Sequence, residues 1–80
     1  MTNTITNLLR ARWAKFALAT FVTETENGNA VDRLGNEDFS NAIADLISDL
    51  LHLALLRKLA PERIIEQAQA NFAAELSEEA

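Results

Sequence analysis

The sequence predicts an all-α protein built from three helices. Its 80 residues include only two glycines and one proline, too few for the many tight turns of an all-β protein. Alanine and leucine dominate the apolar content, and both are good helix formers. Hydrophobic residues make up 49% of the chain and charged residues 24%, which is ordinary for a globular domain. We therefore expect residues 1–80 to fold as a single helical domain.

The first helix is expected over about residues 5–23. Apolar side chains recur there at spacings of three or four, which is typical of the buried side of a helix, at Ile5, Leu9, Trp13, Phe16 and Ala17. Trp13 is expected in the core, with a partner anchor as the alternative. Over residues 24–36 the pattern stops and Asn27-Gly28 favours a turn. This loop is long for a small domain, and Val31 and Leu34 are expected to attach it to the core.

The second and third helices are expected over residues 37–59 and 61–76, joined as a hairpin. Asn36 or Asp38 can cap the second helix, and Pro61 suits the first turn of the third. The connection between them is so short that the two helices must form a tight corner. The acidic residues at the end of the chain are expected to be a solvated, frayed helix end: Glu75, Glu78 and Glu79.

Two apolar rows run side by side along the second helix. One row begins at Phe39 and continues through Leu46 and Leu53, and the second includes Leu51 and Leu55. This surface is wider than one neighbouring helix covers, so we predict a dimeric helical bundle. The predicted oligomer interface consists of Ile43, Leu46, Ile47, Leu50 and Leu53. The alternative is a monomer in which the other two helices cover both rows.

Charge is unevenly distributed along the chain, whose net charge is −5. Residues 1–23 carry Arg10, Arg12 and Lys15 and no acid, which is a poor footprint for nucleic acid. Acids are concentrated in and after the loop, where we predict a surface that binds a basic protein partner: Glu24, Glu26, Asp32, Glu37 and Asp38. If these acidic residues do not bind the partner, the basic side of the first helix is the next candidate surface.

Residue types needed for catalysis are scarce. The chain has no cysteine and one histidine, and it has no glycine-rich phosphate loop. Asp45, Asp49 and His52 are spaced to converge on one side of the second helix, as in half of a metal site. We expect a solvated polar face there instead, and hence no cofactor, no metal and no enzyme activity. No segment has the pattern of a signal peptide or membrane span, so we expect a cytoplasmic protein that binds no membrane.

The chain also resembles known proteins at the level of sequence. Residues 45–54, 59–68 and 72–75 (Asp-Leu-Ile-Ser-Asp-Leu-Leu-His-Leu-Ala, Leu-Ala-Pro-Glu-Arg-Ile-Ile-Glu-Gln-Ala and Phe-Ala-Ala-Glu) resemble the C-terminal half of short helical proteins of bacteria, phages and other mobile elements. A more distant likeness is to the MazG-type all-α nucleotide pyrophosphatases, which bind magnesium through Glu-Glu-x-x-Glu and Glu-x-x-Asp motifs. Here Ala42 stands three residues before Asp45, and no Glu-Glu-x-x-Glu precedes it.

These observations predict a small acidic helical protein that acts by binding another macromolecule. The resemblance implies an accessory, regulator or inhibitor from a mobile element. The alternative function is a minimal, metal-dependent nucleotide hydrolase of MazG-like type that uses Asp45, Asp49 and His52. The identity of the partner and the pathway do not follow from the sequence.

Overall fold

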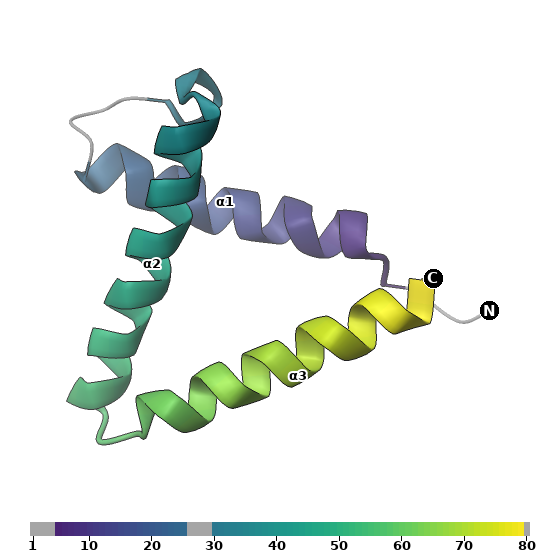
Figure 1. Ribbon diagram of the computed structural model, residues 1–80. Helices are drawn as coiled ribbons and strands as arrows, with labels where there is room; N and C mark the ends of the chain where they lie inside the picture. Colours follow the sequence, from purple (N-terminus) through teal and green to yellow (C-terminus); the bar gives the residue numbers. More distant parts are fainter. Residues whose placement is uncertain (1–4, 26–29, 80) are drawn as a thin grey trace.

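The computed structural model describes residues 5–25 and 30–79. Every regular element in these ranges is helical: α1 (Asn7–Thr25), a short 3₁₀ helix η1 (Val31–Arg33), α2 (Asn36–Leu56) and α3 (Pro61–Glu79). The three α-helices form the sides of a triangle, and the end of α3 lies beside the start of α1 (Figure 1). The prediction of an all-α fold with three helices is confirmed. The predicted hairpin is not formed as an antiparallel pair: α2 and α3 are joined by a short turn but diverge from it (Figure 1).

The corner between α1 and α2 contains most of the buried core. Leu18 and Val22 of α1 pack there against Val31 of η1 and Ala42 of α2, and Val22 is wholly buried. Partly buried residues surround this cluster: Ala19, Phe21, Leu34, Phe39 and Leu46. The predicted attachment of the loop through Val31 and Leu34 is confirmed, and η1 forms a third layer over this corner.

The corner between α2 and α3 is a tight turn with little burial. The Leu59 and Lys58 backbone N–H groups donate to the carbonyl oxygens of Ala54 and Leu55, at 2.9 and 3.0 Å. This pair of hydrogen bonds is a Schellman motif, and it places Lys58 in the left-handed region at φ 61°. α2 therefore ends at Leu56, three residues before the predicted end, whereas α3 begins at Pro61 as predicted. Ala54 is buried at this corner.

The third corner joins the start of α1 to the end of α3 through polar groups. Arg10 Nε lies 3.2 Å from a Glu75 carboxylate oxygen. The Asn7 side-chain amide donates to the Glu75 carbonyl oxygen at 3.0 Å, and the Asn7 backbone N–H donates to the Glu79 carboxylate. The prediction of a frayed acidic end is therefore wrong for Glu75 and Glu79, because α3 extends to Glu79 and both contact α1. A carboxylate is also favoured at the N-terminus of a helix.

The helix starts differ from the predicted caps. Gly35 is the N-cap of α2 and no side chain caps this end, so neither Asn36 nor Asp38 has the predicted role. α1 begins at Asn7, where the Thr6 hydroxyl accepts a hydrogen bond from the Leu9 backbone N–H at 3.2 Å. The other end of α1 extends to Thr25, so the predicted loop over residues 24–36 is shorter in the structure.

Candidate functional site

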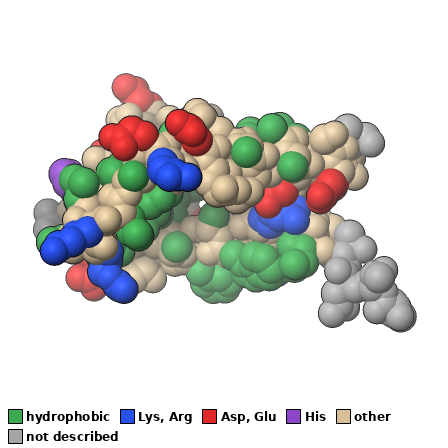
Figure 2. Space-filling model, turned by 90° about the horizontal axis from the view of Figure 1, so that it is seen from below, with side chains coloured by type: hydrophobic (Ala, Val, Ile, Leu, Met, Phe, Trp, Pro, Cys, Tyr) green, Lys and Arg blue, Asp and Glu red, His purple; other side chains and the backbone are tan. Residues whose placement is uncertain are grey.

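The sides of the three helices that point into the triangle form an uncovered apolar surface. A groove of about 490 Å³ runs between α1 and α2, and another of about 390 Å³ runs between α2 and α3. Ile47 and Leu50 line both grooves, so the two adjoin each other along α2. Apolar side chains border a hollow on the side of the molecule drawn in Figure 2. We call this surface the inner face, formed chiefly by Ala14, Ile43, Leu46, Ile47, Leu50 and Phe72.

Much of the inner face is open to solvent. Leu50 at its centre is 53% exposed, and Ile43, Ile47 and Phe72 are exposed as well. Fourteen large apolar side chains in the described ranges are at least 40% exposed, against five buried residues. None of the buried residues belongs to α3. The helices therefore have apolar sides like those of a helical bundle, but no other element of the described chain packs against them.

The whole chain exposes more surface than a compact monomer of its size. Its accessible surface is 6814 Å², whereas a folded monomer of 8.8 kDa exposes about 4,800 Å². Its radius of gyration is 14.5 Å, against about 11.6 Å for a compact domain of 80 residues. The excess area is about 2,000 Å², and apolar side chains of the described helices contribute to it.

The structure brings together four of the five residues of the predicted oligomer interface. Ile43, Leu46, Ile47 and Leu50 all line the groove between α1 and α2. Leu53 is exposed but lines neither groove of the inner face. Leu53 lies on the same side of α2 as Leu46 but seven residues, or about two turns, further along the helix. The groove between α1 and α2 ends before it, at Leu50.

The polar side of α2 faces away from the inner face. Asp45, Asp49 and His52 lie on this side, and all three are exposed. Within the described part of the chain, no three His, Asp or Glu side chains are close enough together to hold a metal ion. The convergence of these three residues on a metal site therefore has no support in the geometry, and no observation favours the hydrolase alternative.

The acidic residues predicted to bind a partner are spread over three elements. Glu24 lies near the end of α1, Asp32 in η1, and Glu37 and Asp38 in the first turn of α2, and all four are exposed. Glu26 lies outside the described residues. Asp32 already has an internal partner, because Lys15 Nζ lies 2.7 Å from its carboxylate. This ion pair reduces the local negative charge of the predicted surface.

The outer side of α1 carries an apolar stripe that sequence analysis assigned to the core. Leu9, Trp13 and Phe16 share this side, whereas the buried residues Leu18 and Val22 lie on the opposite one. Trp13 is 52% exposed and Phe16 is 76% exposed, so the prediction that they are buried is wrong. We call these three residues the outer stripe. Residues 16–22 are apolar almost all round the helix. This pattern is the sequence feature that indicates a second apolar side on α1 besides the buried one.

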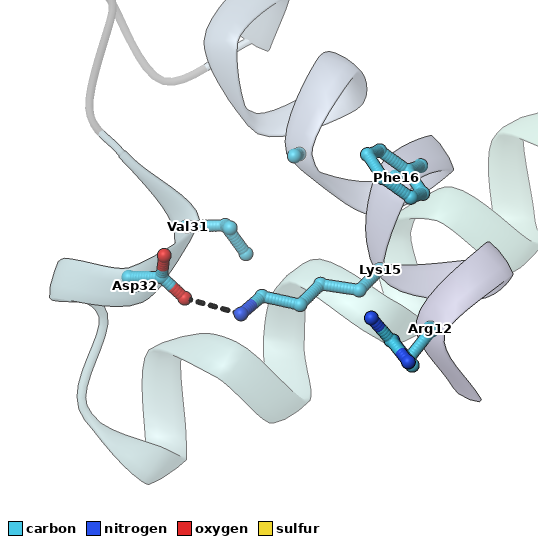
Figure 3. A pocket seen from close by; sticks show the side chains of 6 residues that line it. Arg12, Lys15, Phe16, Val31 and Asp32 are labelled. Atoms are coloured by element: carbon cyan, nitrogen blue, oxygen red, sulfur yellow. Dashed lines mark ion pairs between the residues drawn. The ribbon is translucent and has the colours of Figure 1, made fainter. Parts of the chain in front are cut away.

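A shallow hollow of about 330 Å³ lies beside the outer stripe, between α1 and η1 (Figure 3). Phe16, Ala19 and Val31 supply its apolar lining, and the charged groups at its edge are Arg12, Lys15 and Asp32. Lys15 extends across it to Asp32, while the Arg12 guanidinium lies beside this pair (Figure 3). An apolar floor with charged edges is typical of a pocket that receives one anchoring side chain of a partner.

The expectation that no segment has the pattern of a membrane span is wrong for α2, which has the length and composition of a membrane-crossing helix. It has 21 residues, and 11% of the tested window is buried. Asp45, Asp49 and His52 lie along one side of this helix, and such groups are costly in the centre of a bilayer. A helix that is covered by protein can have the same length and apolar content as a membrane span. A membrane is therefore the alternative to a protein partner for this helix.

Comparison with known protein families, with curated proteins and with solved structures shows no match for this chain.

Proposed function

We propose that this chain is a non-catalytic helical protein that works by binding other macromolecules, and that a second copy of the chain covers its inner face in a homodimer. The observation that carries the proposal is the accessible surface of 6814 Å², which exceeds that of a compact monomer by about 2,000 Å². Fully burying one leucine or isoleucine contributes about 1.5 to 3 kcal/mol. Leaving several of them in water would therefore forfeit much of the stability available to a small domain.

The excess surface of the whole chain is large enough to include the interface of an obligate dimer. Obligate interfaces bury about 2,000 to 5,000 Å² in total, or about 1,000 to 2,500 Å² from each subunit. The excess surface of this chain, about 2,000 Å², lies within that range. A small or transient contact would leave most of the open apolar surface in solvent.

The arrangement of α2 suits a two-fold contact between identical copies. Ile43, Ile47 and Leu50 follow one another at spacings of four and three, which forms a straight apolar seam. In a two-fold dimer the same seam on each copy faces its twin. The nearest acids of the helix, Asp45 and Asp49, lie on the opposite side, so they do not oppose their counterparts across the contact. The flanking α1 and α3 of both copies complete a helical bundle.

The test measures the molar mass by light scattering over a wide range of protein concentrations. We expect at least twice the monomer mass of 8.8 kDa at micromolar concentration. Leu50→Asp should shift the mass toward the monomer, because a charge in a dry contact costs several kcal/mol. Leu56→Asp is the matched control, since Leu56 lies on the same helix, is 81% exposed and lines neither groove.

Two results would overturn the proposal of a homodimer. One is a wild-type mass that stays near 8.8 kDa at every concentration. The other is binding of the wild-type chain, but not of Leu50→Asp, to phospholipid vesicles in a flotation assay, which would assign the inner face to a membrane. Circular dichroism of each variant separates loss of association from loss of helical structure.

The second part of the proposal is a basic protein partner for the acidic residues Glu24, Glu26, Asp32, Glu37 and Asp38. Exposure of the four described residues supports it, and the ion pair of Asp32 with Lys15 weakens it. The proposed role is that of an accessory, regulator or inhibitor from a mobile element, acting in the cytoplasm. Once a basic partner is identified, neutralising Glu24, Glu26 and Asp32 together should slow association and flatten its salt dependence. Unchanged kinetics would remove this surface from consideration.

A further inference from the structure

The outer stripe of α1 stays uncovered when the inner face is filled. Ala11, Ala14 and Leu18 line the groove of the inner face, and the outer stripe of Leu9, Trp13 and Phe16 lies on the opposite side of the same helix. A partner in the groove therefore leaves the outer stripe in solvent. Phe16 is among the most exposed large apolar residues of the described chain, and about half of the Trp13 side chain is exposed. Exposed aromatic residues beside a pocket are typical of protein interaction sites.

Cations outnumber acids around the outer stripe, because Arg12 and Lys15 lie with Asp32 at the edge of the hollow. α1 contains three cations and no acid before Glu24. Arg10 is paired with Glu75, and Lys15 is paired with Asp32. Within the described ranges Arg12 forms no ion pair, and it lies at the edge of the hollow beside Phe16 (Figure 3). The stripe therefore combines an apolar surface, a hollow for one side chain and a guanidinium that pairs with no carboxylate of the described residues.

Charge decides between the possible occupants of the outer stripe. A two-fold contact between two copies of α1 would bring Arg12, which pairs with no described carboxylate, close to the same cation of the second copy, and like charges in a contact are unfavourable. The apolar side of α3 from a second copy cannot cover the outer stripe either, because its residues Ile65, Ala68 and Phe72 already line the inner face. Complementarity requires a partner that supplies both apolar side chains and carboxylates.

We propose that the outer stripe binds an amphipathic helix of a different protein, whose apolar side is flanked by Asp and Glu residues. One large apolar side chain of that helix enters the hollow between Phe16 and Val31. A carboxylate one turn away pairs with Arg12. Helices commonly bind to apolar surfaces in this way, through anchors spaced three, four and seven residues apart. This site is separate from the inner face, so it does not depend on whether the chain forms a dimer.

Two synthetic helical peptides test the proposal with the full chain. They share one apolar side of leucine and phenylalanine without tryptophan, and their flanking residues are glutamate in one and lysine in the other. Trp13, the single tryptophan of the chain, lies in the stripe and reports binding through its fluorescence. We expect a saturable blue shift with the acidic peptide, an affinity at least about tenfold higher than for the basic one, and weaker binding in high salt.

Variants at the stripe identify the site. Phe16→Ser should weaken binding of the acidic peptide about tenfold or more, because it removes the apolar wall of the hollow. Arg12→Glu should weaken it about fivefold and should strengthen binding of the basic peptide. Arg63→Glu makes the same change of charge on an exposed residue of α3 and should leave both affinities unchanged. Phe16 and Arg12 are exposed, so circular dichroism should show folded variants.

Three results would overturn the proposal. They are equal affinity for the two peptides, no saturable change in Trp13 fluorescence with the acidic peptide, and an effect of Arg12→Glu no larger than that of Arg63→Glu. Repeating the titration with Leu50→Asp keeps the two proposals apart. Loss of the dimer with retained peptide binding would support separate sites, whereas failure of the peptide test alone leaves the homodimer proposal standing.

Discussion

The corner between α1 and α2 and the corner between α2 and α3 contain similar side chains but differ in burial. At the first corner, η1 covers the helix pair, and Leu18, Val22, Val31 and Ala42 are buried. At the second corner no further segment of the described chain lies over the helices, and Ala54 is the buried residue. Two crossing helices therefore do not bury their own apolar sides. A third layer is needed, and among the described residues it is present at the first corner alone.

The largest expected effect is at the covered corner. Leu18→Ala should lower the free energy of unfolding by about 2 to 5 kcal/mol, because it removes a buried side chain and leaves a cavity. Leu55→Ala is the matched control on α2, where the side chain is exposed, and it should change stability by less than about 1 kcal/mol. Urea unfolding measures both. Equal losses would mean that the two corners do not differ as described.

The open corner should respond to protein concentration. If a second copy covers it, unfolding is coupled to dissociation, and the apparent free energy of unfolding rises by about 1.4 kcal/mol for each tenfold increase in concentration. Thermal unfolding over three decades of concentration measures this slope. A midpoint that does not move would show that the open corner is stable without a partner copy.

The turn at the second corner carries local backbone strain. Lys58 adopts φ 61° at the end of α2, a conformation that costs a residue with a side chain about 1 kcal/mol and glycine little. Lys58→Gly should therefore stabilise the protein by up to about 1 kcal/mol. Arg57→Gly, one residue earlier at φ −90°, should bring no gain. Equal effects of the two glycines would show that left-handed strain at Lys58 is absent.

A smaller effect is expected at the first corner, where α2 begins without a side-chain cap. Gly35 has extended backbone geometry at φ −68° and ψ 168°, and a Cβ atom built there meets no atom within 4 Å. Gly35→Ser should stabilise α2 by a few tenths of a kcal/mol by accepting a hydrogen bond from a free N–H group. Gly35→Ala is the control and should not stabilise. A gain from alanine equal to that from serine would point to chain entropy instead of capping.

Little or no effect is expected on the polar side of α2, which belongs to neither corner. Asp49→Ala should change the free energy of unfolding by no more than about 0.5 kcal/mol, as for an exposed residue without partners in the core. Elemental analysis of the purified protein gives the complementary measurement. Stoichiometric metal that is lost in this variant would contradict our interpretation and favour the hydrolase alternative.

Local patterns in the sequence determined the helices and several of their ends. Pro61 marks the start of α3 because its ring suits a first helical turn, and the wide apolar surface of α2 predicted that one neighbouring helix would not cover it. Val31 and Leu34 were recognised as the attachment of the loop because they are apolar residues in a polar segment. These features depend on neighbours within a few residues, so sequence spacing is sufficient to predict them.

Tertiary structure alone decided which apolar side of α1 is buried. Leu9, Trp13 and Phe16 form as regular a stripe as Leu18 and Val22 do, and packing of η1 and α2 selected the second set. The contact of Arg10 with Glu75 could not be predicted from the sequence either, because 65 residues separate the two. Helical periodicity shows which residues share a side of a helix. It does not show which side another helix will cover, because that depends on where distant parts of the chain come together.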